Sequence, residues 1–314
     1  MRNLLVFAAV IAVAGYFGAK LYIQHKVSRD LDSVLTQVRP FVDVSYKNVV
    51  ATMGGELRIE GVTARLAQFE DEITVDSVSV LTPGFLFLLG VNDRARDFEF
   101  PAELGFELNG LRARVDADFM REIEKLRDTE IVERELTAAD RCASTYGMTP
   151  VALKKLGYYE MNVDFRTLFR RKADRVTIDL GAHIADMYDF DVMLTLGGIA
   201  DPTELARGAR PLLVNARMDY VDRSLNGRIL AHCAEQQVSA DEVIAAQILE
   251  VQTLARDSGM ELDAMLIDPY TEFLRGKQRL TVTSQPSKPV DLTRINLYKP
   301  SDVPNLLNLM AEAI

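Results

Sequence analysis

The chain has 314 residues, of which 48% are hydrophobic and 26% are charged, and its formal net charge at pH 7 is −10. This length and composition are ordinary for a globular protein with a substantial core. The acidic balance argues against nucleic-acid binding, because contacts to phosphate groups need a basic face.

An apolar segment opens the chain. Residues 4–19 are uncharged, Lys20 interrupts the run, and the segment through Ile23 is about long enough to cross a bilayer core, which takes roughly 20 residues. Residues 12–14 (AVA) also fit a signal-peptide cleavage site, so residues 1–25 are either an anchor or a cleaved signal. We expect an uncleaved transmembrane helix. The basic residues after it favour a cytoplasmic domain, but this rule is weak for long domains, and we expect the domain outside the cytoplasm.

Residues 26–118 show the period-2 alternation of half-buried antiparallel strands. The apolar pattern that starts at Ile73 restarts out of phase at Val78, which indicates a bulge at Asp76-Ser77. Asn109-Gly110 allows either a type I′ hairpin or a bulge within one bent strand, and the short flanking segments favour the bulge. We therefore predict a β-rich N-terminal part.

A run of large apolar residues follows Pro83-Gly84 in this part. It comprises Phe85, Leu86, Phe87, Leu88 and Leu89. The run has no alternation, so it is either a short element buried on both sides or an apolar flap that contacts a membrane or an acyl chain. These five residues are the candidate ligand-binding residues.

Residues 119–157 are charged and helical in pattern, which indicates a helical insert between two strand-rich parts. Residues 158–314 then combine alternating strands with helices in an α+β arrangement. One face of these strands is polar throughout, which is typical of a sheet that is covered on one side only.

Capping residues before proline mark the starts of three helices, at Thr149-Pro150, Asp201-Pro202 and Asp268-Pro269. These segments end near glycines at positions 157, 208 and 276, where a helix C-terminus favours glycine. A capping box that begins at Ser239 opens the longest helix of this part, which ends near Gly259. Residues 225, 229 and 233 have helical spacing, so Cys233 is expected to face the core.

The chain has two cysteines, Cys142 and Cys233. In an oxidising compartment they are the smallest possible disulfide framework, and closing a loop of roughly 90 residues stabilises a fold by about 4–5 kcal/mol in the chain-entropy model. The alternative is two buried free thiols, since cysteine is among the most buried residues. Redox or metal chemistry is not expected, because the sequence has no C-x-x-C motif.

The sequence contains no G-x-S-x-G, H-E-x-x-H, P-loop or G-x-G-x-x-G motif. His232 and Cys233 are adjacent in a predicted helix, so their side chains diverge by about 100° and do not pair. Acidic residues 186, 189 and 191 near His183 are the most metal-like group, but they fit the solvated face of a strand. We therefore predict a protein that is not an enzyme and that holds no catalytic residue, metal or cofactor.

Three segments resemble the opening module of the AsmA-like and YdgA-type bacterial envelope proteins: residues 46–49 (YKNV), residues 55–62 (GELRIEGV), and residues 73–80 (ITVDSVSV) with Pro83. In that group a membrane span precedes the pattern G-x-L-x-I-x-G-V and a second strand that ends in proline. The resemblance implies an anchor in the bacterial inner membrane and a twisted antiparallel sheet in the periplasm. Longer relatives form lipid-conducting grooves, and the group offers no catalytic residues to match.

Together these features predict an α+β fold in which twisted antiparallel sheets are covered on one face by helices, with one N-terminal transmembrane helix. We expect a single-pass protein of the bacterial inner membrane whose soluble domain lies in the periplasm. It is expected to bind an apolar ligand such as membrane lipid, in lipid handling or envelope maintenance. The alternative is a structural or assembly factor that binds another envelope protein.

Overall fold

The computed structural model describes residues 29, 36, 39–40, 42–52, 54–66, 71–84, 87, 101–118, 138–143, 150–199, 204 and 208–314. The chain divides into two compact units, Met1–Leu111 and Arg112–Ile314. The boundary falls inside the fifth strand, β5 (Glu103–Arg114).

Antiparallel strands make up more of the described structure than helices do. Twelve strands pair in the order β1-β3-β4-β5-β6-β7-β8-β9-β10-β12, with β2 beside β3 and β11 beside β9. The expected α+β class is therefore wrong, because the protein is mostly β. Helix caps are local signals that a sequence shows directly, whereas pairing between distant strands is not visible in it, so the sequence patterns do not show how many strands pair.

The strands of the first unit are β1 (Val42–Ser45), β2 (Asn48–Ala51), β3 (Glu56–Leu66), β4 (Glu72–Leu81) and β5. Asn109-Gly110 lies inside β5 and not in a hairpin turn, as the short flanking segments indicated. Gly110 has a φ of +64°, a conformation that favours glycine. A Cβ at this position would clash with the side chain of Asp76, which would have to move to make room.

The pairing of β3 with β4 corrects the predicted bulge at Asp76-Ser77. Glu60 pairs with Ser77 and Val62 pairs with Val75, so the register runs through this point without an offset. The change of phase among the apolar residues coincides instead with Gly61, whose φ is +61°.

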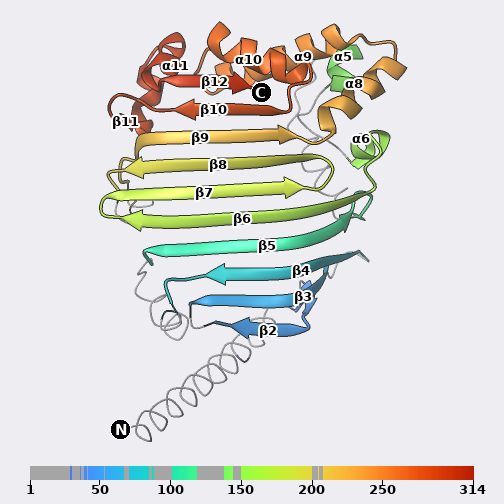
Figure 1. The fold of residues 1–314 in the computed structure, drawn as a ribbon, viewed down its shortest axis with the longest axis vertical. Coiled ribbons are helices and arrows are strands. Elements are labelled where there is room, and N and C mark those ends of the chain that lie inside the picture. Colours follow the sequence, from blue (N-terminus) through green and yellow to red (C-terminus); the bar gives the residue numbers. More distant parts are fainter. Residues whose placement is uncertain are drawn as a thin grey trace, which may run out of the picture. The chain divides into compact units, whose positions relative to one another are not determined.

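The long strands of the second unit run side by side (Figure 1). The strands are β6 (Glu160–Lys172), β7 (Arg175–Ile184), β8 (Tyr188–Gly197), β9 (Leu212–Asp222), β10 (Arg279–Ser284), β11 (Val290–Asp291) and β12 (Leu309–Ala313). The helices are α5 (Ala138–Ala143), α6 (Pro150–Lys155), α8 (Leu225–Glu235), α9 (Ala240–Asp257), α10 (Ala264–Leu274), α11 (Val303–Leu306) and the 3₁₀ helices η1 (Leu292–Leu297) and η2 (Pro300–Asp302). Helices α6 and α8 lie near one end of the strands, and α11 lies near the other end (Figure 1).

Helix α9 begins and ends where the sequence predicts. The Oγ of Ser239 accepts a hydrogen bond from the backbone N–H of Glu242, and the Glu242 carboxylate accepts one from the N–H of Ser239. This capping box satisfies two N–H groups that the helix leaves unpaired. Helix α10, in contrast, begins at Ala264, one turn before the predicted start, and Pro269 lies inside it.

The two faces of the sheet in the second unit differ in chemistry. Directly opposed residues of antiparallel strands share a face. The pairs Phe190–Tyr220 and Val192–Met218 therefore lie on one apolar face, and the pair Asp191–Asp219 lies on the opposite, polar face. This arrangement confirms the alternation that the sequence predicts for these strands.

No helix in the described part of the chain is long and apolar enough to span a membrane. Even the longest described helix, α9, is amphipathic and carries Asp241, Glu242 and Arg256. This finding contradicts the expected transmembrane helix and the expected location as a single-pass inner-membrane protein with a periplasmic domain. The segment on which that expectation rested, residues 4–23, lies outside the described residues.

Candidate functional site

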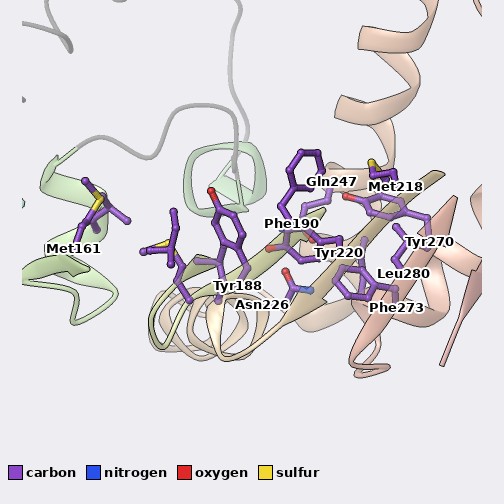
Figure 2. A pocket seen from close by; sticks show the side chains of 15 residues that line it. Met161, Tyr188, Phe190, Met218, Tyr220, Asn226, Gln247, Tyr270, Phe273 and Leu280 are labelled. Atoms are coloured by element: carbon purple, nitrogen blue, oxygen red, sulfur yellow. The ribbon is translucent and has the colours of Figure 1, made fainter. Parts of the chain in front are cut away.

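A cavity of about 470 Å³ lies in the second unit, between the apolar face of the sheet and the helices (Figure 2). Strands β6 to β10 contribute one wall, and helices α6, α8, α9 and α10 contribute the other. Of the 15 lining side chains, all but two are aliphatic, methionine or aromatic. The two exceptions are the amides Asn226 and Gln247, so no described side chain that lines the cavity is charged.

The register of three adjacent strands builds the floor of the cavity. Phe190 of β8 is directly opposite Tyr220 of β9, and Tyr220 is directly opposite Leu280 of β10. Met218 lies two residues before Tyr220 on the same face. Because the side-chain period of a strand is two, all four side chains point toward the helices.

Aromatic rings organise the middle of the cavity. Tyr188 stacks on Tyr220 with ring centroids 5.2 Å apart, and Phe273 of α10 meets Tyr220 edge-on at 5.4 Å. Burial raises the pKa of Tyr188 and Tyr220, and it raises the pKa of Tyr270 to about 12. The three phenols that line the cavity therefore stay neutral at physiological pH.

Helix α10 closes the cavity on the side of β10. Its residues Phe273 and Leu274 are 3% exposed and form a buried cluster with Ile244 of α9 and Leu280 of β10. Fully burying a side chain of this kind stabilises a fold by about 1.5–3 kcal/mol. This packing holds the helical wall against the sheet.

Asn226, in the first turn of α8, is one of the two polar residues of the helical wall. Its backbone N–H donates to the Oδ1 of Asp222 at 3.1 Å, so Asp222 satisfies an N–H group of the first turn that the helix leaves unpaired. Burial raises the pKa of Asp222, although the backbone N–H groups of Asn226 and Leu225 oppose this effect. The Nδ2 of Asn226 is buried and has no hydrogen-bond partner among the described residues. Figure 2 shows this amide in the same cavity as Tyr188, Tyr220 and Phe273.

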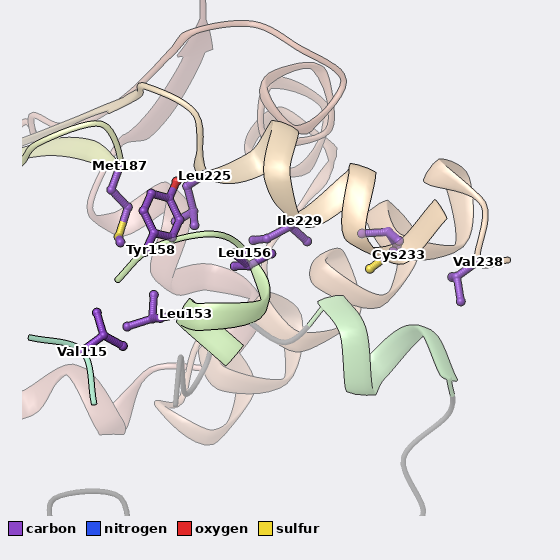
Figure 3. Close-up of a cluster of buried hydrophobic side chains, with 10 residues drawn as sticks. Val115, Leu153, Leu156, Tyr158, Met187, Leu225, Ile229, Cys233 and Val238 are labelled. Atoms are coloured by element: carbon purple, nitrogen blue, oxygen red, sulfur yellow. The ribbon is translucent and has the colours of Figure 1, made fainter. Parts of the chain in front are cut away.

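A buried cluster fixes the position of α8 (Figure 3). Leu225, Ile229 and Cys233 lie on one face of the helix and are 5%, 2% and 0% exposed, which confirms the predicted orientation of Cys233. Of the two alternatives for the cysteines, the structure has the disulfide: Cys233 is bonded to Cys142 of α5. Helix α8 therefore presents Asn226 to the cavity from a well-packed support.

The polar face of the same sheet carries ion pairs. Asp189 accepts hydrogen bonds from His183 and Arg223, and these outweigh burial so that the pKa of Asp189 is lowered. Asp191 pairs with Arg166 at 2.8 Å. Among the described residues, no group of three or more histidine, cysteine or acidic side chains is placed to hold a metal ion. Three residues of the metal-like group of the sequence, His183, Asp189 and Asp191, therefore take part in these pairs.

The candidate ligand-binding residues of the sequence and the cavity are different sets. Of Phe85, Leu86, Phe87, Leu88 and Leu89, only Phe87 is among the described residues, and its N–H donates to the carbonyl of Gly84 at 3.0 Å. Phe87 does not line the cavity. The alternation of β8 and β9 already predicts that Phe190, Met218 and Tyr220 lie on one apolar face. No signal in the sequence shows that the helices leave a cavity over this face.

Part of the second unit matches a known family model. Residues 176–314, from β7 to the C-terminus, match a family model whose description is "Uncharacterized protein". No curated protein matches the chain. The matched segment contains all of the cavity-lining residues except Leu153 and Met161. The resemblance to AsmA-like proteins stays a prediction from strand patterns.

Proposed function

We propose that this chain is a binding protein for an apolar small molecule, and that the ligand occupies the cavity between the sheet and helices α8 to α10. The observation that carries the proposal is a space of about 470 Å³ lined by apolar and aromatic side chains. Ligand sites in proteins are cavities of roughly 300–1,000 Å³ with mostly apolar walls and a few polar groups. A lipid with an acyl chain is the ligand class that we favour.

Binding without catalysis is the role that the lining supports. Serine, cysteine, histidine and carboxylate side chains are the commonest nucleophiles and general bases of enzymes. None of these residue types is among the described residues that line the cavity. The lining instead offers apolar contact and uncharged hydrogen-bonding groups.

A pair of methionines on neighbouring strands allows a matched test. Met218 lines the cavity, whereas Met193 is opposite Arg217 in register and lies on the polar face. The Met218→Trp variant fills part of the cavity, and the Met193→Trp variant adds the same bulk outside it. We expect Met218→Trp to weaken binding of the neutral dye N-phenyl-1-naphthylamine to the full chain by at least about tenfold, since lost volume excludes the ligand.

Fluorescence titration of the dye measures this difference, and thermal unfolding checks that both variants fold. Binding by Met193→Trp should equal that of the natural chain. If folded Met218→Trp binds the dye as tightly as the natural chain does, the cavity is not the binding site and the proposal fails.

A further inference from the structure

We propose that the ligand carries an uncharged hydrogen-bond acceptor, such as an ester or amide carbonyl, and that the side-chain amide of Asn226 binds this group. The inference rests on the proposed function and deepens it, because it names the chemical class of the ligand. Its basis is the unpaired Nδ2 of Asn226, a residue that lines an apolar cavity whose described lining has no charged side chain.

The first observation is the state of the Asn226 amide. Among the described residues, three buried side-chain polar atoms lack a hydrogen-bond partner: Ser79 Oγ, Asn215 Oδ1 and Asn226 Nδ2. Only Asn226 lines the cavity. Buried polar groups in native proteins are nearly always paired, so an unpaired one at a ligand site indicates a missing partner. A carbonyl oxygen of the ligand would supply that partner.

The backbone of Asn226 is held in place while its side chain is able to turn. The N–H of Asn226 is bound by Asp222, and its neighbour Leu225 is 5% exposed in the cluster under α8. The torsion about Cβ–Cγ of asparagine is broad, so the amide is able to rotate its Nδ2 toward the cavity that the residue lines. The amide donor thus lies on a well-packed helix and is able to turn about the Cβ–Cγ bond of Asn226.

Charge excludes an anionic ligand. The described lining contains no lysine, arginine or histidine that would pair with a carboxylate. The carboxyl group that accepts the backbone N–H of Asn226, Asp222, lies on the same sheet face as Tyr188, its directly opposed residue in β8. Burying a second negative charge near it without a cation is unfavourable. A cation would bring donors only and would leave Nδ2 of Asn226 unpaired.

Four probes of equal chain length separate these possibilities: methyl decanoate, decanoate, decylammonium and decane. Each displaces N-phenyl-1-naphthylamine from the full chain at pH 8, where decanoate is ionised. We expect methyl decanoate to bind tightest, about tenfold more tightly than decane, which is the contribution of one good hydrogen bond. Decanoate and decylammonium should bind at least tenfold more weakly than the ester.

The Asn226→Leu variant removes the donor and keeps a side chain of similar size. It should bind the ester about tenfold more weakly and bind decane and the dye unchanged. The control is Asn305→Leu, at an exposed asparagine of α11 outside the cavity, which should leave all four affinities unchanged. Unchanged dye binding in Asn226→Leu shows that the cavity is intact.

Each contrary result identifies what has failed. Decanoate or decylammonium binding as tightly as the ester would overturn the inference, and so would equal losses for ester and decane in Asn226→Leu. If the dye binds in the cavity but none of the four probes displaces it, the inference about the ligand is also overturned, while the proposed function stands. A dye that is insensitive to Met218→Trp would instead overturn the proposed function.

Discussion

Asp219 joins two strands on the polar face of the second unit. Its carboxylate accepts hydrogen bonds from Arg217 of its own strand, β9, and from Thr281 of β10 at 2.7 Å. Arg279 of β10 lies 3.6 Å from the same carboxylate. These partners, first of all the Arg217 guanidinium, lower the pKa of Asp219 although burial opposes them.

The lowered pKa of Asp219 gives a pH dependence with a defined sign. A carboxylate whose pKa is lower in the folded state contributes stability above its unfolded pKa of about 3.9, and this contribution disappears as the pH falls through the folded pKa. The Asp219→Asn variant should therefore be less stable than the natural chain by about 1 kcal/mol at pH 7. The difference should shrink as the pH falls below about 4.

Urea unfolding at pH 7 and at pH 3 measures this change. Asp268→Asn, at an exposed aspartate of α10, is the control and should change stability little at either pH. If Asp219→Asn lowers the free energy of unfolding equally at both pH values, the charge of Asp219 does not account for the loss. The altered hydrogen-bond geometry would then account for it.

The sequence predicts some residues of the candidate site and not others. The alternation of β8 and β9 predicts that Phe190, Met218 and Tyr220 share an apolar face, and the structure confirms it. Asn226 carries no comparable signal. It becomes a candidate only because Asp222 holds its backbone and the folded chain places Asn226 among the cavity-lining residues, which are facts of tertiary structure.

At the scale of elements, the capping box of α9 makes a testable contribution. The box pairs Ser239 with Glu242, and its hydrogen bonds lower the pKa of the Glu242 carboxyl group. Replacing an N-cap serine by alanine costs typically about 1 kcal/mol. The Ser239→Ala variant should lose this amount in urea unfolding.

Ser258, at the other end of the same helix, gives the matched control. Its backbone N–H bonds to the carbonyl of Leu254, so the Ser258→Ala substitution keeps that hydrogen bond. The substitution should leave stability within about 0.5 kcal/mol. Equal losses in Ser239→Ala and Ser258→Ala would contradict a specific role for the box.

The elements that the sequence predicts well are those whose signals are local. The capping box of α9 and the alternation of β6 to β9 need no information from elsewhere in the chain. Helix α10 begins before its predicted cap, and the turn added before Pro269 buries Leu266, which is favourable although Pro269 removes one helical hydrogen bond. Strand β12 escapes prediction since its pairing partner, β10, lies more than twenty residues earlier in the chain.

At the scale of the whole molecule, the cavity depends on several elements that are distant in sequence. Strands β8, β9 and β10 supply the floor, and helices α8 to α10, inserted between β9 and β10, supply the opposite wall. Patterns within each element predict which face is apolar, but they do not determine how far apart two apolar faces settle. The cavity depends on the distance between the two apolar faces, so only the folded structure shows it.

The disulfide is the one covalent tie between such distant elements, and its effect on the second unit is measurable. Cys142 of α5 and Cys233 of α8 are separated by 91 residues. A loop of this length is costly to close without the bond, so reducing the natural chain should lower its free energy of unfolding by about 4–5 kcal/mol in the chain-entropy model. Urea unfolding with and without reductant gives the difference.

The double variant Cys142→Ala/Cys233→Ala is the control, because reductant has no bond to break in it and its unfolding curve should not move. If reduction leaves the midpoint of the natural chain unchanged, the packing of α5 and α8 alone holds this part of the fold, and the bond is dispensable for stability.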